Sequence, residues 1–186
     1  MNKNKKNTKK GLTNSNPYGI IIIERNEREV IQMRENKWLW LDMDGTFVDF
    51  YGVIDWLECL IAHDTKPYRV AKCLYNEYEL LEVLFELKLK GWNIGIISWS
   101  SKENNAEFDK KVEQAKREWM LEKCLDIIID KMIVTPYGVC KADTCRKYGF
   151  GVLADDEEQN RNAWDLGATI DANNNLIEEL KKLLVA

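Results

Sequence analysis

The sequence predicts an α/β fold in which a parallel sheet is flanked by helices. Three apolar segments, residues 38–41, 93–98 and 150–154, have the length and composition of strands that are buried on both faces. The segment at 76–90 has the apolar spacing of an amphipathic helix, so the chain shows the strand, helix, strand order of a parallel sheet. The 186 residues suit one domain, and the 45% hydrophobic content supplies a sizeable core.

The N-terminal part is predicted to be a tail and a β-hairpin that precede the main sheet, with the hairpin extending the edge of the sheet or covering part of it. Residues 1–18 are rich in Asn and Lys and almost free of apolar side chains, so we expect a disordered basic tail. Its simplest role is to aid solubility, and the alternative is contact with nucleic acid or an acidic partner. Residues 19–24 and 29–33 then read as two strands of a β-hairpin, with the turn between them.

A small insertion is predicted after the first buried strand. An apolar segment at 53–62 is broken by the polar residues 63–68, and the helix at 76–90 follows. Only about thirty residues therefore separate strand from helix, which suffices for a short helical lid or flap but not for a second domain. We predict a single domain at 19–186, with the lid at 47–73.

The second half of the chain continues the alternation of strands and helices. A helix at 105–121 presents apolar side chains at helical spacing on one face, namely Phe108, Val112, Ala115 and Trp119. The later predicted elements are short strands at 127–129 and 132–134, a turn at 135–138, a helix from Lys141 to Gly149, a helix at 157–166, a strand at 168–170 and a helix at 175–184.

Polar side chains stand at the ends of three predicted strands. Asp42 and Asp44 follow the first strand, Ser98 ends the second, and Asp155 and Asp156 follow the third. Parallel strands place their carboxyl ends on one edge of the sheet, where ligands bind in open α/β folds. Period-two geometry points the first two aspartates to one side, unless the glycine that follows them bends the chain.

This set of side chains favours phosphoryl transfer. Carboxylates that lie so close repel each other unless a cation lies between them, and oxygen ligands favour Mg²⁺. Lys141, at a helix start just before the third strand, adds an amine at the same edge. A hydroxyl and an ammonium bind phosphate oxygens and offset charge in the transition state. One aspartate can attack phosphorus, and the other can exchange the proton.

In these motifs the sequence resembles the haloacid dehalogenase (HAD) superfamily of phosphatases, from Trp38 to Leu184. The segment Asp42-Met43-Asp44-Gly45-Thr46 resembles its first motif and Ser98 its second. Lys141 resembles the third motif and Asp155-Asp156 the fourth. The resemblance implies a Rossmann-like HAD fold with a small cap. It also implies a phosphatase and not a dehalogenase, because Asp44 is the second aspartate of phosphatases and phosphotransferases.

The resemblance also implies roles for these residues. Asp42 is the expected nucleophile and Asp44 the general acid and base, with Ser98 and Lys141 binding phosphate. The expected Mg²⁺ ligands are Asp42, the backbone carbonyl of Asp44, and Asp156, with Asp155 in support. Residues 42–50 are similar to the 5'(3')-deoxyribonucleotidases and residues 155–162 to the magnesium-dependent phosphatase branch, so the substrate class stays open.

Each assignment has a structural alternative. The Asp-Gly pair could form only a turn, Ser98 could only end its strand, and Asp155 or Asp156 could cap the next helix. Other side chains could take the predicted roles, namely Ser100 or Ser101 for Ser98, and Lys102 or Lys131 for Lys141. Trp56 and Trp99 could stack on a substrate base or belong to the core. Asp49 is expected to cap or turn the chain.

Composition excludes several other classes. A net charge of -4 does not indicate a nucleic-acid-binding domain. Five cysteines without a CxxC pair predict a reduced, cytoplasmic protein without a cysteine zinc site. His63 is the single histidine and lies in a polar stretch, which argues against a Ser-His-Asp triad. Apolar runs are too short to span a membrane, and no apolar region follows the basic N-terminus as in a signal peptide.

The sequence therefore predicts a Mg²⁺-dependent phosphatase that acts on phosphate monoesters through a phospho-aspartate on Asp42. A small phosphorylated substrate, such as a nucleotide, is the first hypothesis for its partner. The alternatives are a phosphatase of polynucleotide ends or of phosphoproteins, and a HAD-like binding module without activity.

Overall fold

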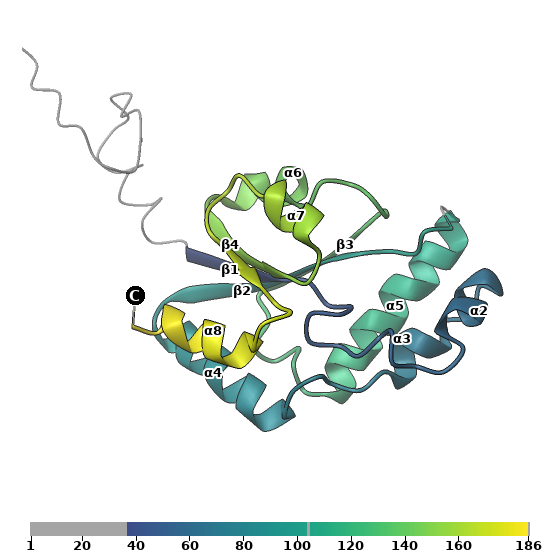
Figure 1. The fold of residues 1–186 in the computed structure, drawn as a ribbon, viewed down its shortest axis with the longest axis horizontal. Coiled ribbons are helices and arrows are strands. Elements are labelled where there is room, and N and C mark those ends of the chain that lie inside the picture. The colour runs from purple at the N-terminus through teal and green to yellow at the C-terminus, as the bar shows by residue number, and fades with distance from the viewer. Residues whose placement is uncertain (1–36, 104, 186) are drawn as a thin grey trace, which may run out of the picture.

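The computed structural model describes residues 37–103 and 105–185 and shows an α/β sandwich (Figure 1). Five parallel strands form one sheet in the order β3-β2-β1-β4-β5. The strands are β1 (Lys37–Leu41), β2 (Trp92–Trp99), β3 (Lys131–Thr135), β4 (Gly151–Asp155) and β5 (Thr169–Asp171). The predicted parallel sheet with flanking helices is therefore confirmed.

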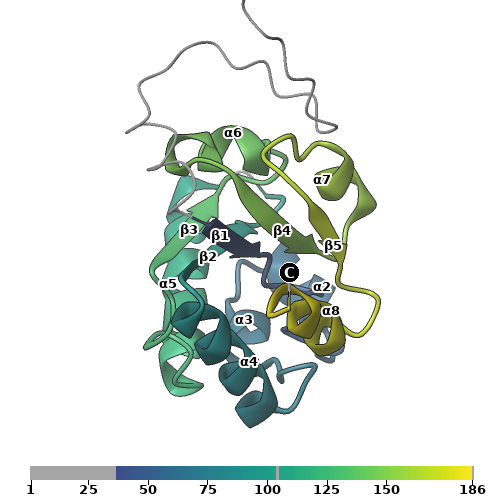
Figure 2. The ribbon, with the colours of Figure 1, turned by 90° about the vertical axis from the view of Figure 1, so that its left-hand side faces the viewer.

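Helices cover both faces of the sheet, and they lie above and below it in Figures 1 and 2. One face carries three helices, namely α4 (Glu77–Leu89), α5 (Ala106–Glu122) and α8 (Leu176–Leu183). The other face carries α6 (Lys141–Cys145), the 3₁₀ turn η1 (Arg146–Tyr148) and α7 (Glu158–Asn162). The sheet is thus the middle of three layers, as right-handed crossovers between parallel strands require.

Side chains of β1 alternate between the two cores. Leu39 and Leu41 pack in the cluster with α4, α5 and α8, whereas Trp40 packs on the opposite face. All three are essentially without solvent exposure, as expected for the central strand of a sheet covered on both sides. The neighbouring strand makes room for Trp40 with a glycine, because a Cβ atom on Gly95 would lie 2.4 Å from the indole ring.

Asparagine caps define the beginnings of the three helices on the first face. The side chain of Asn76 accepts hydrogen bonds from backbone N–H groups at the start of α4, and Asn105 and Asn175 do the same for α5 and α8. The end of α4 is set by Gly91, whose φ of 83° suits a residue without a side chain. These signals explain why the boundaries predicted for the three helices agree with the structure within one or two residues.

Two short helices, α2 (Trp56–Ile61) and α3 (Lys66–Val70), occupy much of the region predicted as the lid. They pack against α5 through a separate apolar cluster in which Phe50, Leu60 and Tyr68 meet Phe108 and Val112. Residues 63–68 are not only the predicted break, because α3 begins among them at Lys66. Pro67 lies in the first turn of this helix, a position that tolerates proline because no intrahelical N–H bond is needed there.

Two predicted elements are corrected by the structure. No strand forms at 127–129, where the chain turns: Ile127 is exposed, Ile128 is buried in the core, and Ile129 packs against the core while partly exposed. The strand begins after Asp130, whose backbone N–H donates to the carbonyl of Ile94 and whose carboxylate accepts from the N–H of Ile94. The helix predicted at 157–166 ends at Asn162, because the chain must turn for Trp164 to pack on the sheet.

Some predictions lie outside the described residues. The basic tail at 1–18 and the hairpin at 19–33 both fall there. Within the described part, no helix is long and apolar enough to cross a membrane.

We expect Gly95→Ala to lower the free energy of unfolding by about 1–3 kcal/mol, because the added methyl group overpacks the contact with Trp40. Urea denaturation measures this loss. In a Trp40→Leu background the same alanine should cost less, since the smaller side chain leaves space. An equal cost in both backgrounds would show that the indole contact is not the cause.

Candidate active site

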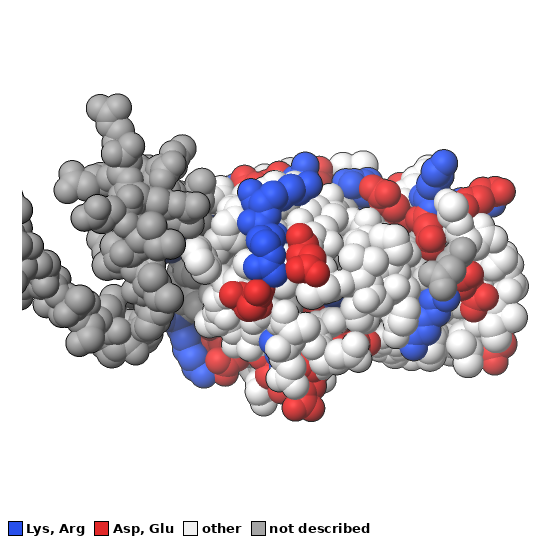
Figure 3. Space-filling model, turned by 90° about the horizontal axis from the view of Figure 1, so that it is seen from above, with Lys and Arg blue, Asp and Glu red and all other residues white. Residues whose placement is uncertain are grey.

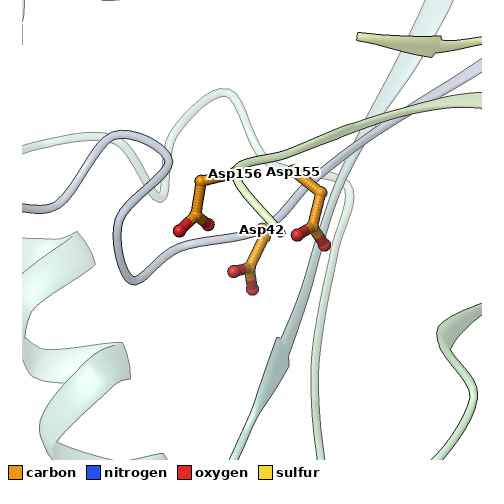
Figure 4. Close-up of side chains that lie close together, drawn as sticks. All are labelled: Asp42, Asp155 and Asp156. Carbon is orange, nitrogen blue, oxygen red and sulfur yellow. The ribbon is translucent and has the colours of Figure 1, made fainter. Parts of the chain in front are cut away.

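The central position of β1 places its carboxyl end at the topological switch point of the sheet. From β1 the chain proceeds outward through β2 to β3, and it then returns to the other side of β1 with β4. Asp42 directly follows β1, Asp155 is the last residue of β4, and Asp156 comes next. Figure 4 shows the three side chains pointing into the same space beyond the strands. Carboxylate oxygens of the three lie within 4.8 Å of one another.

The loop after β1 is tied to the loop after β4. Thr46 donates from its hydroxyl to Asp156 Oδ1 at 3.1 Å and accepts from the backbone N–H of Asp156 at 3.2 Å. Gly45, just before Thr46, bends the chain with a φ of 82°. A Cβ atom on this residue would lie 2.4 Å from Asp156 Oδ2. The glycine of the first motif therefore allows both the turn and the close approach of Asp156.

Lys141, at the start of α6, connects the two strands from the other side. Its ammonium donates to Asp155 Oδ2 at 2.7 Å and lies 2.9 Å from Asp42 Oδ1, an ion pair outside hydrogen-bond geometry. Burial alone would lower the pKa of Lys141, but the charges of Asp42 and Asp155 outweigh it and raise the pKa. This lysine is therefore a permanent cation beside Asp42.

The oxygens of Asp155 are committed to neighbours in the protein. Besides Lys141, they accept from the backbone N–H of Glu157 at 2.9 Å and from the side-chain amide of Asn160 at 3.1 Å. Asp155 is fully buried, whereas Asp156 is partly exposed. Asp156 is thus the better placed of the two to meet a ligand, with Asp155 in support.

A second buried lysine at this edge was not predicted. Lys116 of α5 has no solvent exposure, and its ammonium donates to Asp44 Oδ2 at 2.5 Å, to Ser98 Oγ at 2.8 Å and to the backbone carbonyl of Trp99 at 2.9 Å. The sequence did carry a signal for it. Lys116 follows Phe108 and Val112 at intervals of four residues, so it continues the buried stripe of its helix.

The alternative serines and lysines lie elsewhere. Ser101 donates to Asp109 at the start of α5, and Ser100 is buried with a hydroxyl that has no partner among the described residues. Lys131 begins β3 at the opposite end of the strands, and Lys102 lies over the ring of Tyr137. Among the serines, Ser98 is therefore the one that contacts Lys116, the partner of Asp44. Among the candidate lysines, Lys141 is the one that contacts Asp42 and Asp155.

Asp49 forms a local turn, since its Oδ1 accepts from the backbone N–H of Gly52 at 3.1 Å. Trp56 packs against the apolar cluster that joins α2 and α3 to α5. Trp99 donates from its indole to the carbonyl of Val139, and its ring lies 5.1 Å from the ammonium of Lys141. The indole of Trp99 therefore forms a wall next to the predicted phosphate-binding lysine.

The clustered carboxylates are electrostatically strained without a cation. Burial, together with the negative charges of Asp42 and Asp155, raises the pKa of Asp156 to about 7. Burial also raises the pKa of Asp44, although the positive charge of Lys116 lowers it in part. Burial likewise raises the pKa of Asp155, and the charge of Lys141 lowers it in part. Close carboxylates of this kind favour either protonation or a bound metal ion.

The donor set fits a divalent metal ion. Four aspartates face two buried ammonium groups, so the charged cluster keeps a formal excess of two negative charges, which one divalent cation would neutralise. The buried Oδ1 of Asp42 accepts no hydrogen bond from the described residues. The atoms of this cluster that could bind a metal ion are carboxylate oxygens, the kind of ligand that Mg²⁺ prefers. Asp42 and Asp156 are the side chains that would hold the ion.

No protein-family model matches the sequence, and a sequence comparison with characterised proteins finds no match. Among solved structures, the chain is similar to the D,D-heptose 1,7-bisphosphate phosphatase from Burkholderia thailandensis. The TM-score is 0.52 at 10% sequence identity, and the match covers 81% of this chain and all of that one. The fold is HAD-like. At this identity the likeness concerns the fold, and it confirms the HAD-like fold implied by the four motifs.

We expect Asp156→Asn to stabilise the metal-free protein at pH 8. In the folded state Asp156 has a pKa of about 7, above its ordinary value of 3.8. The stability that the protonated carboxyl group contributes is therefore fully present below about pH 3.8, and it is lost as the pH rises through about 7 and the group ionises. Removing the ionised carboxylate should raise the melting temperature by about 2–4 °C in the presence of a chelator. Differential scanning calorimetry at pH 8 measures this change.

The same variant should lose the further stabilisation that Mg²⁺ gives the unaltered protein. Asp165→Asn is the matched control, since Asp165 is exposed and pairs with Arg146 away from the cluster. The Asp156→Asn protein could instead melt at the same temperature as the unaltered protein in the presence of chelator and still be stabilised by Mg²⁺. That result would exclude Asp156 as a metal ligand.

Proposed function

We propose that this protein is a Mg²⁺-dependent phosphatase that hydrolyses phosphate monoesters through a phospho-aspartate on Asp42. The observation that carries the proposal is the convergence of Asp42, Asp155 and Asp156 with Lys141 at the switch point of a HAD-like sheet. Asp44 lies two residues beyond Asp42 on the same loop, and it contacts Ser98 through Lys116. The proposed nucleophile and acid follow β1, the phosphate-binding hydroxyl of Ser98 lies at the end of β2, and Asp155 and Asp156 lie at the end of β4.

In the first half-reaction, a carboxylate oxygen of Asp42 attacks phosphorus. The bond from phosphorus to the ester oxygen breaks, and its electron pair stays on that oxygen, which takes a proton from Asp44. The products are the alcohol and an acyl phosphate on Asp42. Burial raises the pKa of Asp44, which favours the protonated form that this step needs.

In the second half-reaction, water attacks the phosphorus of the acyl phosphate and gives its proton to Asp44. The bond from phosphorus to the Asp42 oxygen breaks, and its electron pair returns to the carboxylate. Inorganic phosphate leaves, and both aspartates regain their starting states. The cycle therefore consumes one water molecule and no other co-reactant.

The ammonium of Lys141 offsets the charge that develops on phosphate. Lys141 is held beside Asp42 by Asp155, so its ammonium is in place before the substrate arrives. Ser98 offers a hydroxyl from the end of the neighbouring strand. A bound Mg²⁺, held by Asp42 and Asp156 and by the backbone carbonyl of Asp44 that the HAD resemblance implies, would act as a Lewis acid on a phosphate oxygen.

A small phosphorylated molecule, such as a nucleotide, is the substrate class that we propose. The lid consists of two short helices, and the similar solved structure is a phosphatase of a sugar bisphosphate. On the face seen in Figure 3, basic and acidic side chains lie close together. The described part of that face has no continuous basic tract for a polynucleotide. Ion pairs such as those of Arg146 with Asp143 and Asp165 also join opposite charges at the surface.

We expect Asp42→Asn to lower kcat by at least about a thousandfold while the melting curve stays cooperative, because the amide cannot attack phosphorus. Turnover of 4-nitrophenyl phosphate with Mg²⁺ measures the loss. Asp49→Asn is the control, since this aspartate only forms a turn in the same loop and Asn can accept the same hydrogen bond. Retained activity in Asp42→Asn would exclude Asp42 as the nucleophile.

Chelation should also abolish turnover, and added Mg²⁺ should restore it. Equal rates with EDTA and with Mg²⁺ would contradict the metal-dependent mechanism. A panel of nucleotides, sugar phosphates and phosphopeptides then separates the substrate classes by kcat/KM. Preference for phosphopeptides would overturn the small-substrate proposal, and inactivity on every member would favour a binding module.

A further inference from the structure

The proposed cycle assigns no part to Lys116, although this lysine is the most completely enclosed cation at the site. Its side chain has no solvent exposure, and its ammonium has three proton acceptors: Asp44 Oδ2, Ser98 Oγ and the carbonyl of Trp99. An ammonium has three protons, so every donor is used. The ring of Tyr68 from the lid lies 5.2 Å away on a further side.

These contacts join four separate parts of the fold. Asp44 lies on the loop after β1, Ser98 and Trp99 end β2, Lys116 belongs to α5, and Tyr68 belongs to α3. A lysine that merely joined α5 to the sheet would need only one of these partners. Here it contacts both of the side chains that the proposed cycle needs for proton transfer and for phosphate binding.

The directions of the hydrogen bonds restrict what each partner can do. Ser98 Oγ accepts a proton from the ammonium, so its own O–H remains available to donate elsewhere, and an incoming phosphate oxygen is a suitable acceptor. Asp44 Oδ2 is occupied in the same way. Asp44 Oδ1 is buried and has no hydrogen-bond partner among the described residues, so it is the oxygen left to exchange a proton.

We propose that Lys116 is a positioning residue that orients Asp44 and Ser98 for the reaction. It fixes Asp44 through Oδ2 so that Oδ1 meets the ester oxygen, and it turns the hydroxyl of Ser98 toward phosphate. This inference rests on the proposed phosphatase function. It adds that the proton passes from Asp44 Oδ1 to the ester oxygen as the bond from phosphorus to that oxygen breaks.

The test compares two aryl phosphates of nearly equal shape. The phenoxide that leaves phenyl phosphate needs a proton, whereas the 4-nitrophenoxide that leaves 4-nitrophenyl phosphate is stable without one. The ratio kcat/KM reports only the steps up to release of this first product. If Lys116 orients the acid, Lys116→Met should lower kcat/KM about a hundredfold or more for phenyl phosphate and about tenfold or less for 4-nitrophenyl phosphate.

A purely structural role would lower both values by the same factor, because damage to the fold does not distinguish leaving groups. Equal losses on the two substrates, or no loss, would therefore overturn the inference. Lys111→Met is the matched control, since Lys111 lies on the same helix and pairs with Glu107 at the exposed surface. It should change neither value.

The folding of Lys116→Met must be checked separately, because methionine leaves the buried carboxylate of Asp44 without its cation. Circular dichroism and thermal melting identify a variant that does not fold, and in that case Lys116→Gln replaces it. The amide of Gln is neutral but still donates to Asp44 and Ser98, so it should retain more activity on phenyl phosphate than methionine would. Equal losses with Gln on the two substrates would again contradict the inference.

The two proposals fail in distinguishable ways. If the unaltered protein with Mg²⁺ hydrolyses neither aryl phosphate nor any member of the substrate panel, the phosphatase function itself is wrong. If the unaltered protein is active but the Lys116 variants show no dependence on the leaving group, only the positioning role is wrong.

Discussion

Repulsion among buried carboxylates is the constraint on which the rest of this site depends. Asp42, Asp155 and Asp156 approach within 4.8 Å, and Asp44 lies on the same loop as Asp42. In a region of low dielectric such groups ionise together only if cations compensate them. Two wholly or almost wholly buried lysines supply part of this compensation from opposite faces of the sheet, because Lys141 begins α6 and Lys116 lies on α5.

The sheet holds this unfavourable arrangement together with apolar packing. β1 is central and is covered on both faces, so the loop that carries Asp42 and Asp44 starts from the buried end of this strand. Thr46 and Gly45 then bring the loop after β1 against Asp156. The hydrophobic core thus stabilises a charged edge that would not form alone, as is common where ligands bind.

The sequence was sufficient for the fold and for most side chains at this edge, because buried strands and their polar ends are local patterns. It failed where tertiary contacts outweigh local preference. Ile127–Ile129 has the composition of a strand, yet the hydrogen bonds to β2 begin only at Asp130. Lys116 was missed because a lysine on a helix is usually solvated, and its partners come from distant segments. The roles of the site residues remain predictions.

The pairing of Asp42 with the acids of β4 has a consequence for biosynthesis. Thr46 and Asp156, which tie the two loops together, are 110 positions apart in the chain. A growing polypeptide therefore displays its first aspartates long before the partners that complete the cluster have been translated. A chain that has not yet reached β4 cannot assemble the three-carboxylate cluster, so any chemistry at this edge begins only after β4 and Asp156 have been translated.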